Sequence, residues 1–182
     1  VRSGAFRWTS EDGIVALPEA GNEALGVSAA GSVVVGNSSV QSGNEAFRWT
    51  QAGGLVGLGD LPGGEFGSEA KAVSADGRIV VGNSSTGADN EFFVWTQANG
   101  MQRVQDILEA DGTTGISGWS KLRAGGISDN GQWVVGQGTN PSGIREAFLA
   151  QLPDTVTLGF KINPGLNDAW YDPATDGQGF FI

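Results

Sequence analysis

The chain has 182 residues, with twenty acidic and ten basic side chains, a formal net charge of -10, and neither cysteine nor histidine. This composition excludes disulfides, thiol catalysis and most zinc sites, and the acidic charge, with no basic stripe to offset it, argues against nucleic acid as a partner. The length suits one domain, and no apolar run is long enough to cross a bilayer, so we expect no membrane insertion.

The first recurring element is a short strand. It occurs four times, as AFRWT at residues 5–9, AFRWT at 46–50, FFVWT at 92–96 and AFLAQ at 147–151. Apolar and polar residues alternate, so that Phe47 and Trp49 share one face, as in a half-buried strand. Trp8, Trp49 and Trp95 recur at the same position, which predicts that all three lie in the core.

The second recurring element is a hairpin. It reads GVSAAGSVVVGNSS at residues 26–39, AVSADGRIVVGNSS at 72–85 and GISDNGQWVVGQGT at 126–139. The pairs Asp76-Gly77 and Asn130-Gly131 predict type I′ turns, in which both central residues need a positive φ. The run that follows, such as Ile79 to Val81, is apolar at every position, which predicts a strand buried between two layers.

We predict an all-β fold of tandem four-stranded repeats, arranged as β-propeller-like blades, because a blade of four short strands has a period of about 40 to 50 residues. A β-solenoid, an open repeat array and a sandwich built of hairpins are the alternatives. The array covers residues 1–152, in units of about 1–44, 45–90 and 91–145 and a fourth strand at 146–152. Residues 153–182 form a C-terminal extension, which we interpret as the start of a further β module or as a donated strand.

Three units and one strand are too few to close a propeller of about 4 to 8 blades. The chain could be a fragment of a longer propeller, two chains could pair to complete one, or the open edges could join chains into a filament.

The segments AFRWT, LGDLPGGEFGSEAKAVSADGRIVVGNS and EAFLA resemble the HAF-type extracellular repeat of bacterial secreted and autotransporter-like proteins. The resemblance covers Val1 to Leu152, although the characteristic His is missing from every copy. It implies an exported protein, extracellular or at the cell surface, and it carries no established activity. The chain opens at Val1 without a charged and apolar leader, so we expect any signal peptide to have been removed or to lie outside this sequence.

Residues that occur once per repeat suggest structural roles. Ser28, Ser74 and Ser128 precede the turns, and a chain without histidine cannot supply the usual base of a serine triad, so we expect these hydroxyls to bond within the hairpins. Glutamates at one repeat position (Glu45, Glu91 and Glu146) belong to the acidic residues that could form a glycosidase pair, but an active site needs to occur only once. We therefore predict that the protein is not an enzyme.

Two kinds of side chain are candidates for ligand binding. Asp172 and Asp176 lie in the DPATDG segment and could bind Ca²⁺ through loop oxygens, although turn formation also explains them, and no other cofactor is expected. Trp119, Trp133 and Trp170 stand outside the periodic tryptophan position and could stack on the sugar rings of a surface polysaccharide.

The unclosed edges lead to the functional hypothesis. We expect an exported bacterial structural or adhesive protein that associates with copies of itself. The contacts that we expect are Ala5, Phe6 and Trp8 in the first strand and Phe180, Phe181 and Ile182 at the end of the sequence. The alternative is a carbohydrate-binding module of a larger secreted protein.

Overall fold

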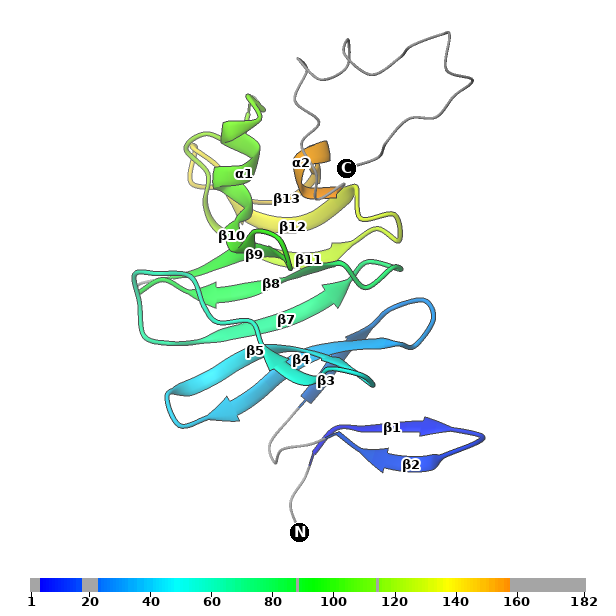
Figure 1. Ribbon diagram of the computed structural model, residues 1–182. Helices are drawn as coiled ribbons and strands as arrows, with labels where there is room; N and C mark the ends of the chain where they lie inside the picture. Colours follow the sequence, from blue (N-terminus) through cyan, green and yellow to red (C-terminus); the bar gives the residue numbers. More distant parts are fainter. Residues whose placement is uncertain (1–3, 18–22, 88, 114, 158–182) are drawn as a thin grey trace, which may run out of the picture.

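The chain folds into antiparallel sheets that follow one another in chain order. The computed structural model describes residues 4–17, 23–87, 89–113 and 115–157. In this part of the chain a two-stranded sheet is followed by two four-stranded sheets and a three-stranded sheet. Figure 1 shows them stacked from the bottom of the view to the top, and the described sheets do not close into a ring.

The strands of each sheet are consecutive in the sequence. The first sheet contains β1 (Phe6–Thr9) and β2 (Gly13–Ala16). The second contains β3 (Glu23–Val27), β4 (Val33–Val40), β5 (Gly43–Thr50) and β6 (Gly54–Gly57). The third contains β7 (Ser68–Val73), β8 (Ile79–Ser85), β9 (Asn90–Thr96) and β10 (Gly100–Arg103). The fourth contains β11 (Ser120–Ile127), β12 (Trp133–Thr139) and β13 (Arg145–Gln151). Two helices, α1 (Val104–Ala110) and α2 (Asp154–Thr157), complete the described fold.

The predicted fold class is confirmed, because the strands form four-stranded antiparallel sheets of blade type. The sheets are offset by two strands from the units counted in the sequence. Unit 45–90, for example, supplies the last two strands of one sheet, β5 and β6, and the first two strands of the next, β7 and β8. The first sheet therefore consists of the strand pair that elsewhere completes a blade.

Each four-stranded sheet is apolar on both faces. Val33 and Val35 of β4 face the next sheet, where they pack with Val80 and Phe93. The opposite face carries Phe47, which is buried against the β1–β2 sheet. The prediction that the apolar runs lie between two layers is thereby confirmed for β8, whose Ile79, Val80 and Val81 are all buried.

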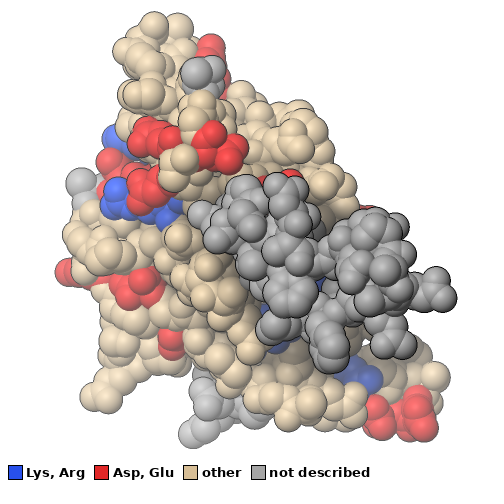
Figure 2. All heavy atoms as spheres, turned by 45° about the horizontal axis from the view of Figure 1, so that its top comes forward, with Lys and Arg blue, Asp and Glu red and all other residues tan. Residues whose placement is uncertain are grey.

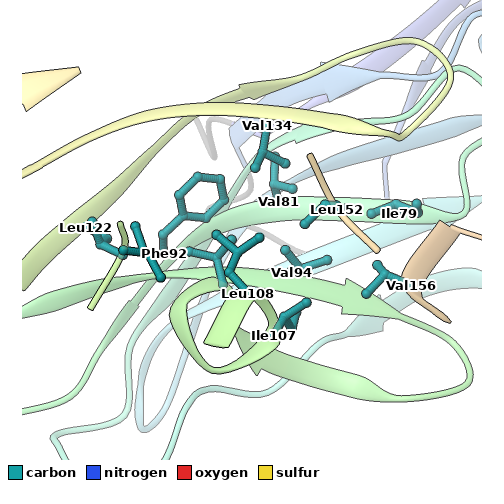
Figure 3. Close-up of a cluster of buried hydrophobic side chains, with 12 residues drawn as sticks. Ile79, Val81, Phe92, Val94, Ile107, Leu108, Leu122, Val134, Leu152 and Val156 are labelled. Carbon is teal, nitrogen blue, oxygen red and sulfur yellow. The ribbon is translucent and has the colours of Figure 1, made fainter. Parts of the chain in front are cut away.

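The largest core lies between the β7–β10 and β11–β13 sheets, and α1 contributes buried side chains to it. Ile107 and Leu108 of α1 belong to the same cluster as Phe92 and Val94 of β9 and Val134 of β12. Figure 3 shows these side chains converging from the helix and from both sheets. No helix among the described residues is long and apolar enough to cross a membrane.

A glycine in the second strand of every larger sheet is required by close packing. A Cβ on Gly82 would collide with the carbonyl oxygen of Glu69 and would lie 2.7 Å from the ring of Phe93. Gly36 and Gly136 meet an equivalent carbonyl and an equivalent Phe ring. The first strand bulges at this point, since its register with the second strand shifts in all three sheets. Glycine recurs at this repeat position because the bulged first strand lies against it on one side and an aromatic ring lies against it on the other.

The predicted hairpins are confirmed, but the predicted type I′ turn is wrong. Among the described residues Lys121 alone has a positive φ without being glycine, so neither Asp76 nor Asn130 adopts the conformation that a type I′ turn requires. Gly77 has a φ of 75° and Gly131 a φ of 74°. The glycine is therefore the one residue of each turn with a left-handed backbone, and the loop between the two strands is longer than two residues.

Serine hydroxyls close these longer loops, as predicted. The Ile79 N–H donates to Ser74 Oγ at 3.1 Å, and the Ser74 N–H donates to the carbonyl oxygen of Ile79 at 2.9 Å. Ser28 and Ser128 make the same two bonds with the residues five positions later. The repeated serine is thus part of the hairpin framework.

The hairpin loops of successive sheets are hydrogen-bonded to one another. The Ala29 N–H donates to the carbonyl oxygen of Ala75 at 3.1 Å, and the Ala75 N–H donates to the carbonyl oxygen of Asp129 at 2.9 Å. These three residues hold the same repeat position. The loops therefore form a series that runs along one side of the array.

We expect Gly82→Ala to lower the free energy of unfolding by about 2 kcal/mol or more, because the new methyl group overpacks the bulge and the Phe93 ring. The matched control is Gly126→Ala, since Gly126 has its nearest neighbour at an ordinary 3.7 Å and its counterpart in the third sheet is Ala72. The control should change stability by less than about 0.5 kcal/mol. Urea denaturation measures both, and equal effects would contradict this account of the glycine.

We expect Asp76 to contribute a stabilisation that is lost in acid. Desolvation alone would raise its pKa, but the bonds from the Ser74 hydroxyl and the Arg78 N–H, with the charge of Arg78, bring the pKa below its ordinary value. A lowered carboxyl pKa stabilises the fold above the unfolded-state value of about 3.9 and ceases to do so as the pH falls through the folded-state value. Asp76→Asn, which copies Asn130, should keep both bonds and lose less stability than the parent between about pH 5 and about pH 2. Asp76→Ala, which removes both bonds, should cost about 1 kcal/mol at neutral pH. Denaturation at several pH values would contradict this if the parent and Asp76→Asn showed the same slope.

Candidate functional site

The first sheet exposes an apolar surface that the same sequence buries elsewhere. Trp8 is 63% exposed and Phe6 is 61% exposed, whereas Trp49 and Phe47, in the second copy of AFRWT, are 8% and 0% exposed. Ile14, which pairs with Trp8 across the hairpin, is exposed too. We call Phe6, Trp8 and Ile14 the start face. The prediction that Trp8 lies in the core is wrong, because no described sheet covers this side of β1.

A hollow of about 460 Å³ adjoins β1, beside the start face. Its walls come from β1 and from the first two strands of the next sheet, including Leu25, Val27 and Val34. In the complete sheets the third strand pairs with the second, whereas β1, at the same repeat position, pairs with β2 alone among the described strands. The hollow therefore lies where the first hairpin of a complete sheet would run.

The last sheet presents a second uncovered apolar face. Trp133, Val135 and Leu149 are all exposed, although their counterparts in the third sheet, Ile79, Val81 and Val94, are buried. Leu149 is 63% exposed, against 2% for Val94. The exposed side of the β11–β13 sheet, which we call the finish face, thus keeps the apolar pattern of a covered face.

Basic side chains gather at one end of the finish face. A pocket of about 250 Å³ is lined by Lys121, Arg123, Gly138, Thr139 and Arg145, and we call it the basic pocket. Arg123 and Arg145 form no ion pair within the described residues, whereas Lys121 Nζ lies 3.4 Å from Asp89 Oδ1. Figure 2, in which this end of the molecule comes forward, shows acidic side chains over more of the visible surface than basic ones, which are confined to small patches.

The basic pocket was not predicted from the sequence, although the repeat alignment contains a signal for it. Arg123 occupies the position of Glu23 and Glu69, and Arg145 occupies the position of Asn44 and Asn90. Both exchanges make the last sheet more basic than the earlier ones. Lys121 has a φ of 55°, an unfavourable backbone conformation for a residue with a side chain, at a register irregularity between Ser120 and Arg123.

The candidate tryptophans do not come together. Trp119 is half-buried and packs edge-on against Phe148, with 6.1 Å between ring centroids, on the side of the last sheet that faces the third. Trp133 is 40% exposed on the opposite side, the finish face. Trp170 lies outside the described residues. Of the predicted sugar-binding positions, Trp133 is the one whose ring is open to a ligand in the described structure.

Several other predicted contacts lie elsewhere or outside the described residues. Ala5 is buried against the second sheet and does not belong to the start face. The proposed calcium ligands Asp172 and Asp176 lie outside the described residues, as do the proposed contacts Phe180, Phe181 and Ile182. Within residues 4–17, 23–87, 89–113 and 115–157, no group of three acidic side chains is placed to hold a metal ion.

The repeated glutamates serve local structure where their bonds are described. Glu45 Oε1 accepts the Gly59 N–H at 3.0 Å, and Glu146 Oε2 accepts a bond from Asn140 Nδ2 at 2.9 Å. Burial raises the pKa of Glu91 above its ordinary value, against the opposing charge of Arg103, and the carboxylates of Asp89 and Asp106 add to the rise. A raised pKa of this kind lowers stability as the pH rises through the carboxyl range, because the partly buried side chain loses its proton.

Comparison with known proteins shows the fold alone. No protein-family model matches the chain, and no curated protein matches it significantly. TolB from Acinetobacter baumannii is similar in structure, with 14% sequence identity and a TM-score of 0.52 over 79% of this chain and 33% of that one. A TolB-like protein from Agrobacterium tumefaciens gives 14% identity and a TM-score of 0.48 over 76% of this chain and 48% of that one. The chain thus spans between a third and a half of the length of these neighbours, and the likeness to the first supports a propeller-like array.

We expect Trp119 and Trp133 to differ in their effect on stability. Trp119→Ala should lower the free energy of unfolding by about 2 kcal/mol, less than the cost for a fully buried Trp, because it opens the contact with Phe148. Trp133→Ala should cost less than about 1 kcal/mol, since the ring already faces solvent. Thermal and urea denaturation of the two variants give the comparison, and a larger loss for Trp133→Ala would show that its ring is covered.

Proposed function

We propose that the chain belongs to an exported structural or adhesive β-repeat protein, extracellular or at the cell surface, that associates with copies of itself and performs no catalysis. The observation that carries the proposal is that apolar side chains at each end of the array are exposed, although the residues at the same repeat positions inside the array are buried. Trp8 and Leu149 are each 63% exposed, while their counterparts Trp49 and Val94 are buried between sheets. The resemblance to HAF-type repeats supports the exported location.

The contact that fits these two faces is head-to-tail. Inside the chain, Ala46 and Leu58 pack in the same cluster as Phe93 of the next sheet, just as Ala5 and Leu17 pack with Phe47. Ala147 and Leu149 of one copy would therefore cover Phe6 and Trp8 of the next. Such a contact joins two different surfaces, and it either closes into a ring or continues as a filament. Two copies supply eight sheet positions, which is within the range of about 4 to 8 blades found in propellers, so we expect a ring of two.

Variants blocked at one end test this arrangement in the 182-residue chain. Phe6→Ser/Trp8→Ser removes two of the three side chains of the start face, and Leu149→Asp removes the most exposed apolar side chain of the finish face. We expect each variant alone to be monomeric in sedimentation velocity, with self-association weakened at least about tenfold. An equimolar mixture should form a 1:1 dimer, because it retains one intact surface of each kind.

The controls are exposed apolar residues away from both faces. Ile144→Asp, in the β12–β13 loop, and Val56→Ser, in β6, should associate as the parent does. A parent chain that stays monomeric at high concentration would refute self-association. If the Leu149→Asp variant alone formed dimers, the contact would be start face to start face, and the head-to-tail proposal would be wrong.

A second candidate function is carbohydrate binding, which the exposed ring of Trp133 favours. Aromatic rings that combine an apolar face with a polar edge suit a surface where a sugar is held partly in water. Trp133 lies on the same sheet face as Arg123 and Arg145 of the basic pocket.

A further inference from the structure

We propose that the basic pocket binds the carboxylate or sulfate groups of an acidic polysaccharide that runs along the finish face. The site comprises Lys121, Arg123, Thr139 and Arg145, with Trp133 further along the same face. This proposal goes beyond self-association and does not depend on it.

The first support is the local reversal of charge. The chain has ten basic residues and a net charge of -10, yet three of its basic side chains line one small pocket. In the two preceding sheets the positions of Arg123 and Arg145 carry Glu and Asn, residues that this fold accommodates. Arginine is therefore not needed there to build the sheet, and the two guanidinium groups are without an acidic partner among the described residues.

The second support is the geometry of the donors. Arg123 lies on β11 opposite Gln137, and Arg145 lies on β13 opposite Thr139, so the two arginines flank the middle strand. Neighbouring strands are about 4.8 Å apart, which separates the backbones of the arginines by about 10 Å across the sheet. Guanidinium groups bind carboxylates and sulfate-like oxyanions with two parallel hydrogen bonds, and the Thr139 hydroxyl adds a further donor.

The third support is the extent of the face. Trp133 and Thr139 lie on one side of β12 and are six residues apart, or about 20 Å along the strand. A ligand that contacts both the indole and the arginines must be an extended chain. A polysaccharide with acidic groups offers anions for the pocket and sugar rings for stacking on Trp133.

The site stays open in the proposed assembly. Within the chain, Val33 and Val35, the counterparts of Trp133 and Val135, pack with Val80 in the first hairpin of the following sheet. The β1–β2 sheet contains no strands at those two positions in the described structure. A second copy stacked on Leu149 would therefore cover the outer part of the finish face and leave Trp133 and the basic pocket accessible.

The test uses the full 182-residue chain and measures binding of polygalacturonate and dextran sulfate by calorimetry, with dextran as the neutral reference. The variant Arg123→Glu/Arg145→Asn restores the residues of the earlier sheets, so it should fold normally. We expect it to bind the acidic polymers at least about tenfold more weakly than the parent, and we expect binding by the parent to weaken as salt is added. Trp133→Ala should weaken binding to a smaller extent, and dextran should not bind.

Three controls distinguish binding at the basic pocket from a general effect of charge, from an effect of self-association and from binding of other anionic ligands. Arg78→Glu changes the charge by as much as Arg123→Glu does on an exposed loop of the third sheet, and it should bind as the parent does. Phe6→Ser/Trp8→Ser, which leaves the finish face unchanged, should retain polysaccharide binding even when it is monomeric, so failure of the assembly proposal would be distinguishable from failure of the binding site. Equal binding by the parent and by Arg123→Glu/Arg145→Asn would overturn the site. Full displacement of the polymer by monomeric galacturonate, or competition by polyglutamate equal to that by polygalacturonate, would overturn the assignment to a polysaccharide.

Discussion

Burial of two apolar faces per sheet is the constraint on which this structure depends. A sheet with one apolar face can lie on a core and present its other side to water, but β8, with Ile79, Val80 and Val81 all buried, needs a neighbour on both sides. Each full burial of such a side chain contributes about 1.5 to 3 kcal/mol, whereas backbone pairing alone leaves small sheets marginal. The stacking of sheets in chain order follows from this requirement, and so does the problem of the first and last sheets.

The small residues in the repeat adapt this stacking to a bulged first strand. Gly82 admits the carbonyl oxygen of Glu69 on one side and the ring of Phe93 on the other, and Ser74 satisfies the backbone of the loop that joins the two strands. These residues hold the same positions in all three larger sheets. The repeat can therefore vary at its exposed loops while the contact between neighbouring sheets is kept.

The fold class, the hairpins and the role of the serines could be predicted from the sequence, because each leaves a periodic signal. The offset between units and sheets could not, since AFRWT recurs with the same spacing wherever a blade is taken to begin. The turn type was mispredicted because Asp76 forms bonds with Ser74 and Arg78 that suit a longer loop. Trp8 has the same sequence neighbours as Trp49, and only the arrangement of the sheets distinguishes an exposed ring from a buried one. Arg123 stands three residues before the second repeated element, as Glu23 and Glu69 do, so the change of charge is present in the sequence, whereas the pocket that Arg123 forms with Arg145 depends on the pairing of the strands.

The series of bonds between hairpin loops makes the array resemble a one-dimensional lattice. Ala75 has a loop neighbour on both sides, whereas among the described residues the Ala29 carbonyl and the Asp129 N–H mark the two ends of the series. In such a lattice the free energy of each unit is its own plus that of its contacts, so units with one neighbour open before units with two. Amide hydrogen exchange would then be graded along the chain, slowest in the β7–β10 sheet and faster toward either end, and the cooperativity of unfolding would grow with every unit added.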